Sequence, residues 1–252
     1  MIVASQTRNV ASPSSRRSPR PSPHSLLKNG PLLLKASGFP ATARYHLACV
    51  PTAWGTCGIV WKLVDSPTES FPTGFIEKST HALLSRIITP GLPQAELRKL
   101  LLSQYPQCNE VLGDREGNFH PEVVPEWFPE LARCLRAYYT NAVCNGVGSD
   151  LTNTWNMWRL RLDWSSLTQF QRAVLDATAA IPRGRRLTYG EIAKKIHKPR
   201  ASRAVGAALG SNPWPVLVPC HRVVGANGSM TGFSAPGGVE VKRRMLEMEQ
   251  LA

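Results

Sequence analysis

Two short helical segments separated by a sharp break constrain the fold of this chain most strongly. In the first, LTYGEIAKKI at 187–196, Thr188 is placed to cap the helix and apolar side chains recur on one face. The tripeptide HKP at 197–199 ends it, and a second helix is predicted from about Arg200 to Leu209. This pattern is typical of a helix-turn-helix, although an ordinary helix pair in a core has it too.

Positive charge is concentrated in the same part of the chain. Residues 1–37 carry six basic side chains and no acid, and residues 38–150 carry nine basic and eleven acidic ones. Residues 151–252 carry fifteen basic and six acidic side chains, so they hold +9 of the total net charge of +13. This distribution favours a polyanionic partner for the C-terminal part, while a basic surface without any partner is the alternative.

Composition divides the chain into three parts. Residues 1–37 are rich in Ser, Pro and Arg, cannot bury a core and are predicted to be a disordered tail. The segment GVGSD at 146–150 indicates a linker, so we expect an N-terminal domain over 38–150 and a C-terminal domain over 151–252. No apolar run approaches the roughly 20 residues that cross a bilayer. We therefore expect no membrane partner, and the lack of a secretory signal indicates a protein that is not secreted.

The N-terminal domain is predicted to be a small α/β unit, a sheet with helices. Apolar and polar residues alternate over 44–65 around a Pro/Gly turn, which predicts a β-hairpin. Leu and aromatic residues have helical spacing over 93–105 and 125–139. The chain's six cysteines are scattered without a CxxC pair, so we expect free thiols, no metal site and no cofactor.

The C-terminal domain is predicted to be mostly α-helical and winged-helix-like around the helix-turn-helix. Alternation of Trp158, Leu160 and Leu162 predicts a strand that leads into this domain. Either Ser166 or Thr168 is expected to cap the following helix, which contains FQRAVLDATAA.

An apolar run after the helix-turn-helix leads to the residue of greatest chemical interest. Val216 to Val218 are predicted to be a buried strand that Pro219 stops, and Cys220, His221 and Arg222 follow directly. A cysteine at the end of an apolar strand is usually inert packing. The adjacent histidine and arginine, with a DNA-binding pattern just upstream, favour a functional thiol instead.

Residues 160 to 250 resemble the O6-alkylguanine-DNA alkyltransferase family, also called methylated-DNA–protein-cysteine methyltransferases. The family's PCHRV motif is complete at 219–223, IPRGRRLTYGEIA and RAVGAALGSNP match its helix-turn-helix and hinge, and GFSAPGGVEVKRRMLEME resembles its closing helix. The resemblance implies DNA repair by a single-turnover S-methyltransferase. An alkyl group would pass directly from O6-alkylguanine in double-stranded DNA to the protein's cysteine after the nucleotide is flipped out. It also implies a monomer without a cofactor.

The resemblance assigns the reacting groups. Cys220 is the acceptor, because a soft thiolate suits displacement at an alkyl carbon. His221 would activate it through a water molecule, and Glu249 would orient and balance His221. Tyr189 would donate a hydrogen bond near N3 of the guanine leaving group.

Contacts with substrate or DNA are implied for five further residues: Arg203, Asn212, Phe233, Ser234 and Arg222. Arg203 would fill the stack left by the flipped nucleotide, and Asn212 would tie the helix-turn-helix to the strand bearing the cysteine. Ser234 would contact the O6 edge. Phe233 stands where many members of the family have Tyr. The SAPGG segment holds two residues more than the family's shorter SGG-like form, which bears on the width of the alkyl group that fits.

The main alternative is a non-catalytic protein that binds DNA lesions or regulates transcription. Relatives of that kind lack the acceptor cysteine, which is present here as Cys220. A thiol hydrolase is less favoured, because the adjacent Cys220 and His221 would rarely point at each other. A repair protein of this family is expected in the cytoplasm of a bacterium or the nucleus of a eukaryote.

Overall fold

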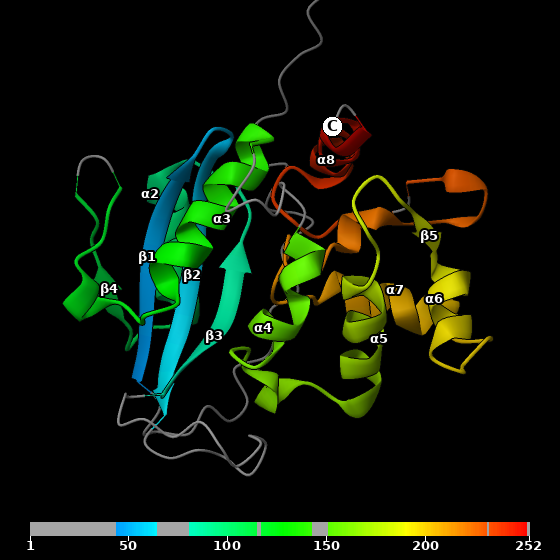
Figure 1. The fold of residues 1–252 in the computed structure, drawn as a ribbon, viewed down its shortest axis with the longest axis horizontal. Helices are drawn as coiled ribbons and strands as arrows, with labels where there is room; N and C mark the ends of the chain where they lie inside the picture. The colour runs from blue at the N-terminus through cyan, green and yellow to red at the C-terminus, as the bar shows by residue number, and fades with distance from the viewer. Residues whose placement is uncertain (1–43, 65–80, 115–116, 143–150, 231, 251–252) are drawn as a thin grey trace, which may run out of the picture.

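A four-stranded mixed sheet forms the N-terminal part of the protein, and helices form most of the rest (Figure 1). The predicted tail and the linker at 146–150 lie outside the residues that the structure describes. The computed structural model describes residues 44–64, 81–114, 117–142, 151–230 and 232–250.

The sheet has the strand order β3-β2-β1-β4. The predicted hairpin is present as β1 (Arg44–Thr52) and β2 (Gly55–Val64), and Gly55 adopts the positive φ of 118° that its tight turn requires. Strand β3 (His81–Ile88) pairs antiparallel with β2, whereas the short β4 (Asn109–Val111) pairs in parallel with β1.

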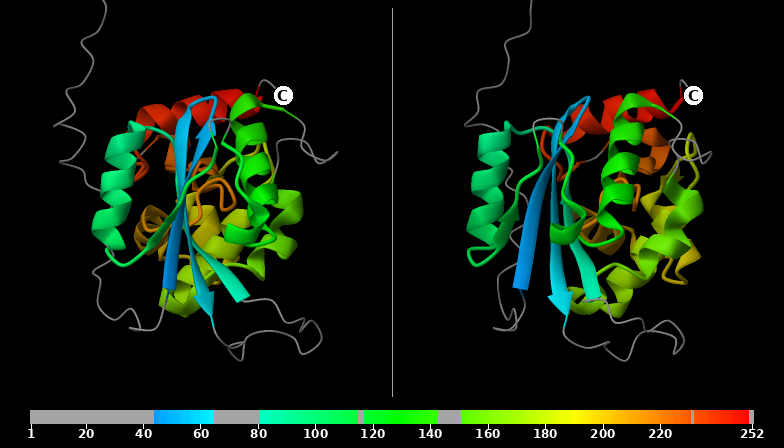
Figure 2. Two further views of the ribbon diagram at one scale, coloured as in Figure 1. Left: turned by 90° about the vertical axis from the view of Figure 1, so that its left-hand side faces the viewer. Right: turned by 60° about the vertical axis from the view of Figure 1, so that its left-hand side comes forward.

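Two helices cover opposite faces of this sheet (Figure 2). They are α2 (Gln94–Gln104) and α3 (Phe128–Thr140), so both helices predicted for this part are confirmed. A 3-10 turn, η1 (Pro121–Val123), precedes α3. Helix α2 buries Leu97 and Leu101 in a small core of its own, and α3 buries its apolar face on the other side of the sheet.

The C-terminal part is mostly helical, as predicted, with one small parallel sheet of β5 and β6. No helix in the described ranges is both long and apolar enough to cross a membrane. In chain order its elements are η2 (Leu151–Thr154), α4 (Trp155–Arg159), η3 (Trp164–Ser166), α5 (Gln169–Ala179), β5 (Leu187–Thr188), α6 (Tyr189–Lys195), α7 (Ser202–Gly210), η4 (Cys220–Arg222), β6 (Val223–Val224), η5 (Ala226–Gly228) and α8 (Gly238–Gln250).

Side-chain caps define the starts of two of these helices. Of the two residues predicted to cap α5, Thr168 does so, in a reciprocal pair with Gln171. Thr188 caps α6 as predicted, in the same arrangement with Glu191. Each such cap stabilises its helix by about 1 kcal/mol. The chain leaves α6 through His197, whose φ of 57° breaks the helix at the predicted place.

Two predicted strands are wrong. Instead of starting a strand, Trp158 lies in the short helix α4, because Trp155 and Trp158 are buried at helical i, i+3 spacing, and Leu162 makes an isolated parallel bridge to Leu84. Leu160, the middle residue of the apparent alternation, is 50% exposed. The run from Val216 to Val218 is buried as expected, but it forms a tight turn in which Val216 has a φ of 77°.

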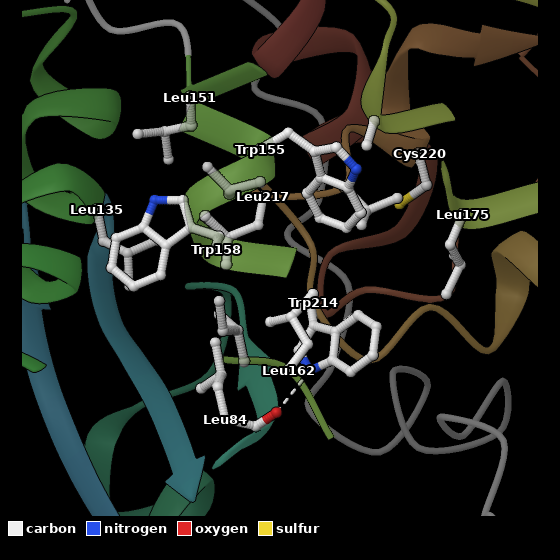
Figure 3. Packing of buried hydrophobic residues seen from close by; sticks show 14 of the residues in the cluster. Leu84, Leu135, Leu151, Trp155, Trp158, Leu162, Leu175, Trp214, Leu217 and Cys220 are labelled. Carbon is white, nitrogen blue, oxygen red and sulfur yellow. Dashed lines mark hydrogen bonds between the residues drawn. The ribbon is translucent and has the colours of Figure 1, made fainter. Parts of the chain in front are cut away.

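One hydrophobic core joins the N-terminal and C-terminal parts. Leu84 of β3, Leu135 of α3, and Trp158, Leu175 and Trp214 of the C-terminal part belong to the same cluster (Figure 3). The indole Nε1 of Trp214 donates a hydrogen bond to the carbonyl oxygen of Leu84 at 3.0 Å. The two parts are therefore held together by packing as well as by polar contacts.

The C-terminal part also completes the outer edge of the sheet at β3. The backbone N–H of Leu84 donates to the Arg161 carbonyl at 2.7 Å, and the Leu84 carbonyl accepts from Asp163 N–H at 2.9 Å. Further along the strand, Ile87 N–H donates to the Pro213 carbonyl at 2.8 Å. These bonds cover an edge that would otherwise be open to other strands.

Candidate active site

The loop that carries Cys220 is held in a strained turn. Asn212, just after α7, accepts from Trp214 N–H at 3.0 Å through its Oδ1 and donates to the Val218 carbonyl at 2.9 Å through its Nδ2. The turn forces the β-branched Val216 into the left-handed region, which costs about 1–3 kcal/mol. Asn212 thus links the helix-turn-helix to the Cys220 loop, in agreement with the tie that the resemblance implies, although the linked segment is a turn rather than a strand.

Cys220 is the first residue of η4 and is only 9% exposed. It belongs to the shared core and is drawn with that cluster in Figure 3. Burial raises the pKa of its thiol, although a hydrogen bond from Asn212 and the charge of Lys242 act in the opposite direction. The resting residue is therefore a thiol that must lose a proton before it can act as a nucleophile.

A buried ion network stands directly after the cysteine. Glu249, on α8, accepts from His221 Nε2 at 2.8 Å. Arg222 donates to both oxygens of the same carboxylate, each at 2.9 Å. Burial alone would raise the pKa of Glu249, but hydrogen bonds from His221 and Arg222 and the charge of Arg222 hold it well below its usual range. Glu249 is therefore a carboxylate at every working pH.

These contacts fix the proton on the imidazole of His221. Because the carboxylate of Glu249 accepts from Nε2, that nitrogen carries the hydrogen and Nδ1 keeps its lone pair. Burial lowers the pKa of His221, with Glu249 opposing the shift only in part. Nδ1 has no hydrogen-bond partner among the described residues. The neutral ring of His221, the residue that follows Cys220 in the chain, thus offers Nδ1 as a basic nitrogen. The imidazolium that forms when Nδ1 takes up a proton would face Glu249.

Tyr138, in the N-terminal part of the protein, also belongs to this network. Sequence analysis did not predict this contact. The hydroxyl of Tyr138, on α3, lies 3.0 Å from Glu249 Oε1 and 3.1 Å from His221 Nε2. Burial and the nearby charge of Glu249 raise the pKa of Tyr138 well above its usual range, so it stays a hydrogen-bond donor. In the sequence Tyr138 is one of several aromatic residues on an amphipathic helix. The one hint is that a buried tyrosine hydroxyl needs a partner.

Tyr138→Phe is expected to raise the pKa of His221. Without the donated hydrogen bond, the Glu249 carboxylate carries more negative charge toward the ring and favours imidazolium. We also expect stability to fall by about 1 kcal/mol, the scale of one hydrogen bond. NMR titration of the ring protons measures the shift. Tyr139→Phe is the matched control, since Tyr139 is equally buried but makes no hydrogen bond to this pair among the described residues. An unchanged His221 titration in Tyr138→Phe would contradict the coupling.

Cys220 opens into a groove of ≈ 850 Å³ beside the helix-turn-helix. Four of the predicted site residues line this groove together with the cysteine: Tyr189, Arg203, Phe233 and Ser234. The ammonium group of Lys242 lies 5.9 Å from the ring centre of Tyr189 and donates to the Val223 carbonyl at 2.6 Å. The sequence did not single out Lys242 as a site residue.

The outer face of helix α7 carries small side chains around one long, positively charged side chain, that of Arg203. Arg203 is exposed there, next to Ala204 and Ala207, and Gly206 packs near the ring of Tyr189. Such a face allows another backbone to approach closely. The exposed cations around it are Lys194, Lys195, Lys198 and Arg200. No group of His, Cys, Asp or Glu suited to a metal ion occurs in the part of the chain that the structure describes.

Arg222 is not placed to contact DNA or substrate, so that expectation is corrected. Only 1% of the residue is exposed, and besides Glu249 it donates to the Ile181 carbonyl at 2.6 Å. The turn of η4 points the Arg222 side chain inward. Its place in the PCHRV motif gives no information about that direction. Its role is to hold Glu249 charged and in place. Glu247, the nearby acid on α8, is exposed.

Comparisons with known proteins single out the same part of the chain. The family model described as "6-O-methylguanine DNA methyltransferase, DNA binding domain" matches residues 169–251. An inducible methylated-DNA–protein-cysteine methyltransferase of Bacillus subtilis is 53% identical over 85 residues, which are 34% of this chain and 46% of that protein. A methylated-DNA–protein-cysteine methyltransferase of Methanosarcina acetivorans is 51% identical over 82 residues, 32% of this chain and 51% of that protein. The chain thus spans about half the length of these curated relatives.

The structural likeness extends over both parts of the protein. A crystal structure of Mycobacterium tuberculosis OGT in complex with DNA is similar with a TM-score of 0.50 and 26% sequence identity. The match covers 82% of this chain and 93% of that one. The N-terminal sheet with its helices and the helical C-terminal part therefore both have counterparts in a solved structure.

Proposed function

We propose that this chain repairs alkylated DNA. Residues 169–251 match the DNA-binding domain of the 6-O-methylguanine DNA methyltransferase family, which supports this proposal. The chain transfers a methyl or other alkyl group from O6 of guanine in duplex DNA to its own Cys220. One observation carries the proposal: the thiol lines a groove beside the helix-turn-helix, and the next residue is a neutral histidine backed by a buried carboxylate. The same groove holds the side chains expected to contact the base.

The chemistry follows from the protonation states of this network. Cys220 gives its proton through a water molecule to Nδ1 of His221, and Glu249 stabilises the imidazolium that forms. The thiolate attacks the alkyl carbon in line with the C–O6 bond. That bond breaks, its electron pair goes to guanine, and guanine takes up a proton in its usual keto form, aided by hydrogen bonding from Tyr189. A thioether remains on the protein, and because no group in the site can remove it, each molecule reacts once.

Access to the base requires the nucleotide to leave the duplex. Helix α7 approaches the DNA through its small outer face, the surrounding cations contact phosphates, and Arg203 fills the gap in the stack. The protein acts as a monomer in the compartment that holds the genome, the cytoplasm in a bacterium or the nucleus in a eukaryote.

Mass spectrometry after incubation with a duplex containing O6-methylguanine tests the proposal. The intact protein is expected to gain one methyl group, and the gain to map to the peptide that contains Cys220. Excess substrate should not carry the reaction beyond one methyl per molecule. Tight binding of the duplex without any gain in mass would instead support the alternative, a non-catalytic protein that binds lesions. A methyl group on another residue would contradict the assigned site.

Arg203→Ala is expected to slow repair of duplex DNA by about 10²-fold, because unstacking a base costs a few kcal/mol and nothing then fills the gap. Arg203→Lys should lie between this variant and the wild type, since lysine keeps the charge but lacks the planar group that stacks. Both should react almost normally with the free base O6-benzylguanine, which needs no flipping. Single-turnover rates on the two substrates measure the difference.

Arg200→Ala is the matched control for Arg203, because it removes an exposed cation from the turn before α7. A phosphate contact there would weaken binding mildly and lessen its salt dependence, without a specific loss of flipping. Equal losses for Arg203→Ala on duplex and free base would show that Arg203 supports the pocket rather than the flipped state.

A further inference from the structure

A second, smaller pocket leads from Cys220 toward the N-terminal part of the protein. Its volume is ≈ 70 Å³, and it shares Phe233 and Ser234 with the groove beside the helix-turn-helix. One water molecule needs about 10–15 Å³ of such space, so the pocket can hold a group of a few non-hydrogen atoms. The N-terminal part contributes residues of β3, of α2 and of the segment after β3: Arg86, Ile87, Ile88, Thr89, Leu100 and Gln104.

This N-terminal wall is fixed relative to Cys220. Ile87 is bonded through its N–H to Pro213, in the loop that leads to the cysteine. Gly91, with a φ of 147°, lies so close to Pro236 that a Cβ would come within 2.8 Å of the proline's carbonyl oxygen. Pro236 belongs to the SAPGG segment with its two extra residues. The extra length therefore packs against the N-terminal part and closes one end of the pocket.

The polar groups that the N-terminal wall offers include two hydrogen-bond donors. Arg86 is half-buried, and its Nη1 lies 3.5 Å from Gln104 Oε1, which leaves further guanidinium N–H groups. Thr89 is 1% exposed, and its Oγ1 has no hydrogen-bond partner among the described residues. Of the described residues that line the pocket, Arg86 is the one with a formal charge, and none is a carboxylate. A buried hydroxyl without a partner is costly, so this wall suits a ligand that accepts hydrogen bonds.

We propose that this pocket receives the outer end of the alkyl group, and that Arg86 and Thr89 let the protein accept alkyl groups ending in a carboxylate. The inference rests on the proposed function. In an in-line displacement the sulfur approaches opposite O6, so any substituent on the reacting carbon points sideways from that line. With the base in the groove beside α7, this pocket is the adjoining space that also reaches Cys220. A carboxylate there would accept from Thr89 and from the guanidinium of Arg86.

The reaction balances without a further reagent for O6-carboxymethylguanine. The thiolate of Cys220 forms a bond to the methylene carbon, and the bond from that carbon to O6 breaks. The electron pair goes to guanine, which takes up the equivalent of the proton that the thiol gave to His221. The carboxylate is unchanged and ends on the protein as S-carboxymethylcysteine.

Single-turnover rates with matched duplexes containing O6-methylguanine or O6-carboxymethylguanine test the inference, with intact mass as the readout. The wild type should transfer both groups. Arg86→Met should lower the carboxymethyl rate relative to the methyl rate by about tenfold, the scale of one partly exposed charge-assisted hydrogen bond. Arg86→Lys should restore much of that ratio, because it keeps the charge. Thr89→Val should also lower the ratio, and its thermal midpoint should not fall, since the hydroxyl it removes has no hydrogen-bond partner among the described residues.

Arg98→Met is the control for lost charge, because Arg98 is an exposed residue of α2 that does not line the pocket. It should leave the ratio of the two rates unchanged. Transfer of methyl but not carboxymethyl by the wild type would overturn the inference and leave the proposed function standing. So would an Arg86→Met variant that lost both rates equally. If the wild type transferred neither group, the proposed function would fail, and this inference with it.

Discussion

Cys220→Ser is expected to abolish alkyl transfer while the fold and DNA binding survive. An alcohol ionises far too weakly to attack the alkyl carbon, and loss of the nucleophile typically slows an enzyme by 10⁴-fold or more, so we expect at least about that loss here. The exchange of sulfur for oxygen at a site that is 9% exposed leaves the surrounding packing nearly unchanged. Transfer of radiolabelled methyl from DNA to protein measures the reaction, and thermal unfolding checks the fold.

Cys134→Ser provides a control of similar burial. Cys134 is 5% exposed on α3, and its Sγ donates to Glu130 Oε1, a bond that a serine hydroxyl can replace. This variant should transfer methyl at the wild-type rate. If Cys220→Ser still accepted label while Cys134→Ser did not, the acceptor would have been assigned to the wrong cysteine.

Glu249→Gln is expected to have the second-largest effect, on both rate and stability. The amide has nearly the same shape but no charge, so it leaves the guanidinium of Arg222 buried without a counter-ion, which costs about 3–5 kcal/mol. It also removes the anion that stabilises the His221 imidazolium. We therefore expect transfer to slow by about 10²-fold, the lower end of what a general base contributes. Denaturant unfolding and single-turnover rates measure the two effects.

Glu247→Gln makes the same change two residues away on α8, where the side chain is exposed, and should alter neither quantity measurably. A Glu249→Gln protein with a rate within twofold of the wild type would rule out a role for the carboxylate in proton transfer.

The stability lost in Glu249→Gln should itself depend on pH. Since the folded-state pKa of Glu249 is held below its unfolded value of about 4.3, its contribution is complete above that value and is lost as pH falls through the folded pKa. Wild type and variant should therefore differ most at neutral pH and converge in acid. Urea unfolding at pH 7 and at low pH tests the sign. A gap that widened in acid would contradict the assigned direction.

The features that could be predicted from the sequence depend on neighbours along the chain. Thr188 and Thr168 cap helices through residues three positions on, and the break at 197–199 is equally local. The candidate reacting residues Cys220 and His221 could be singled out because the motif that carries them is contiguous. Prediction from the sequence is strongest where the interacting residues lie within a few positions of one another along the chain.

The features that sequence analysis missed depend on contacts between distant segments or on side-chain direction. Tyr138 contacts a histidine 83 positions away, and no local pattern separates it from an aromatic residue that only packs. The resemblance implies that Arg222 contacts substrate or DNA, whereas η4 turns its side chain inward. The predicted strand near Trp158 failed because it rested on only three alternating positions, whereas the buried pair Trp155 and Trp158 has helical i, i+3 spacing.

Completion of the β3 edge by much later residues has a consequence for synthesis on the ribosome. The partners of Leu84 are Arg161 and Asp163, and Ile87 bonds to Pro213, so the strand is translated long before the residues that cover it. At usual elongation rates this interval is on the order of ten seconds. During that time the nascent sheet presents an uncovered edge, the kind of surface that recruits other strands and leads to aggregation. The edge at β3 therefore gains the residues that cover it only after the C-terminal segment has emerged.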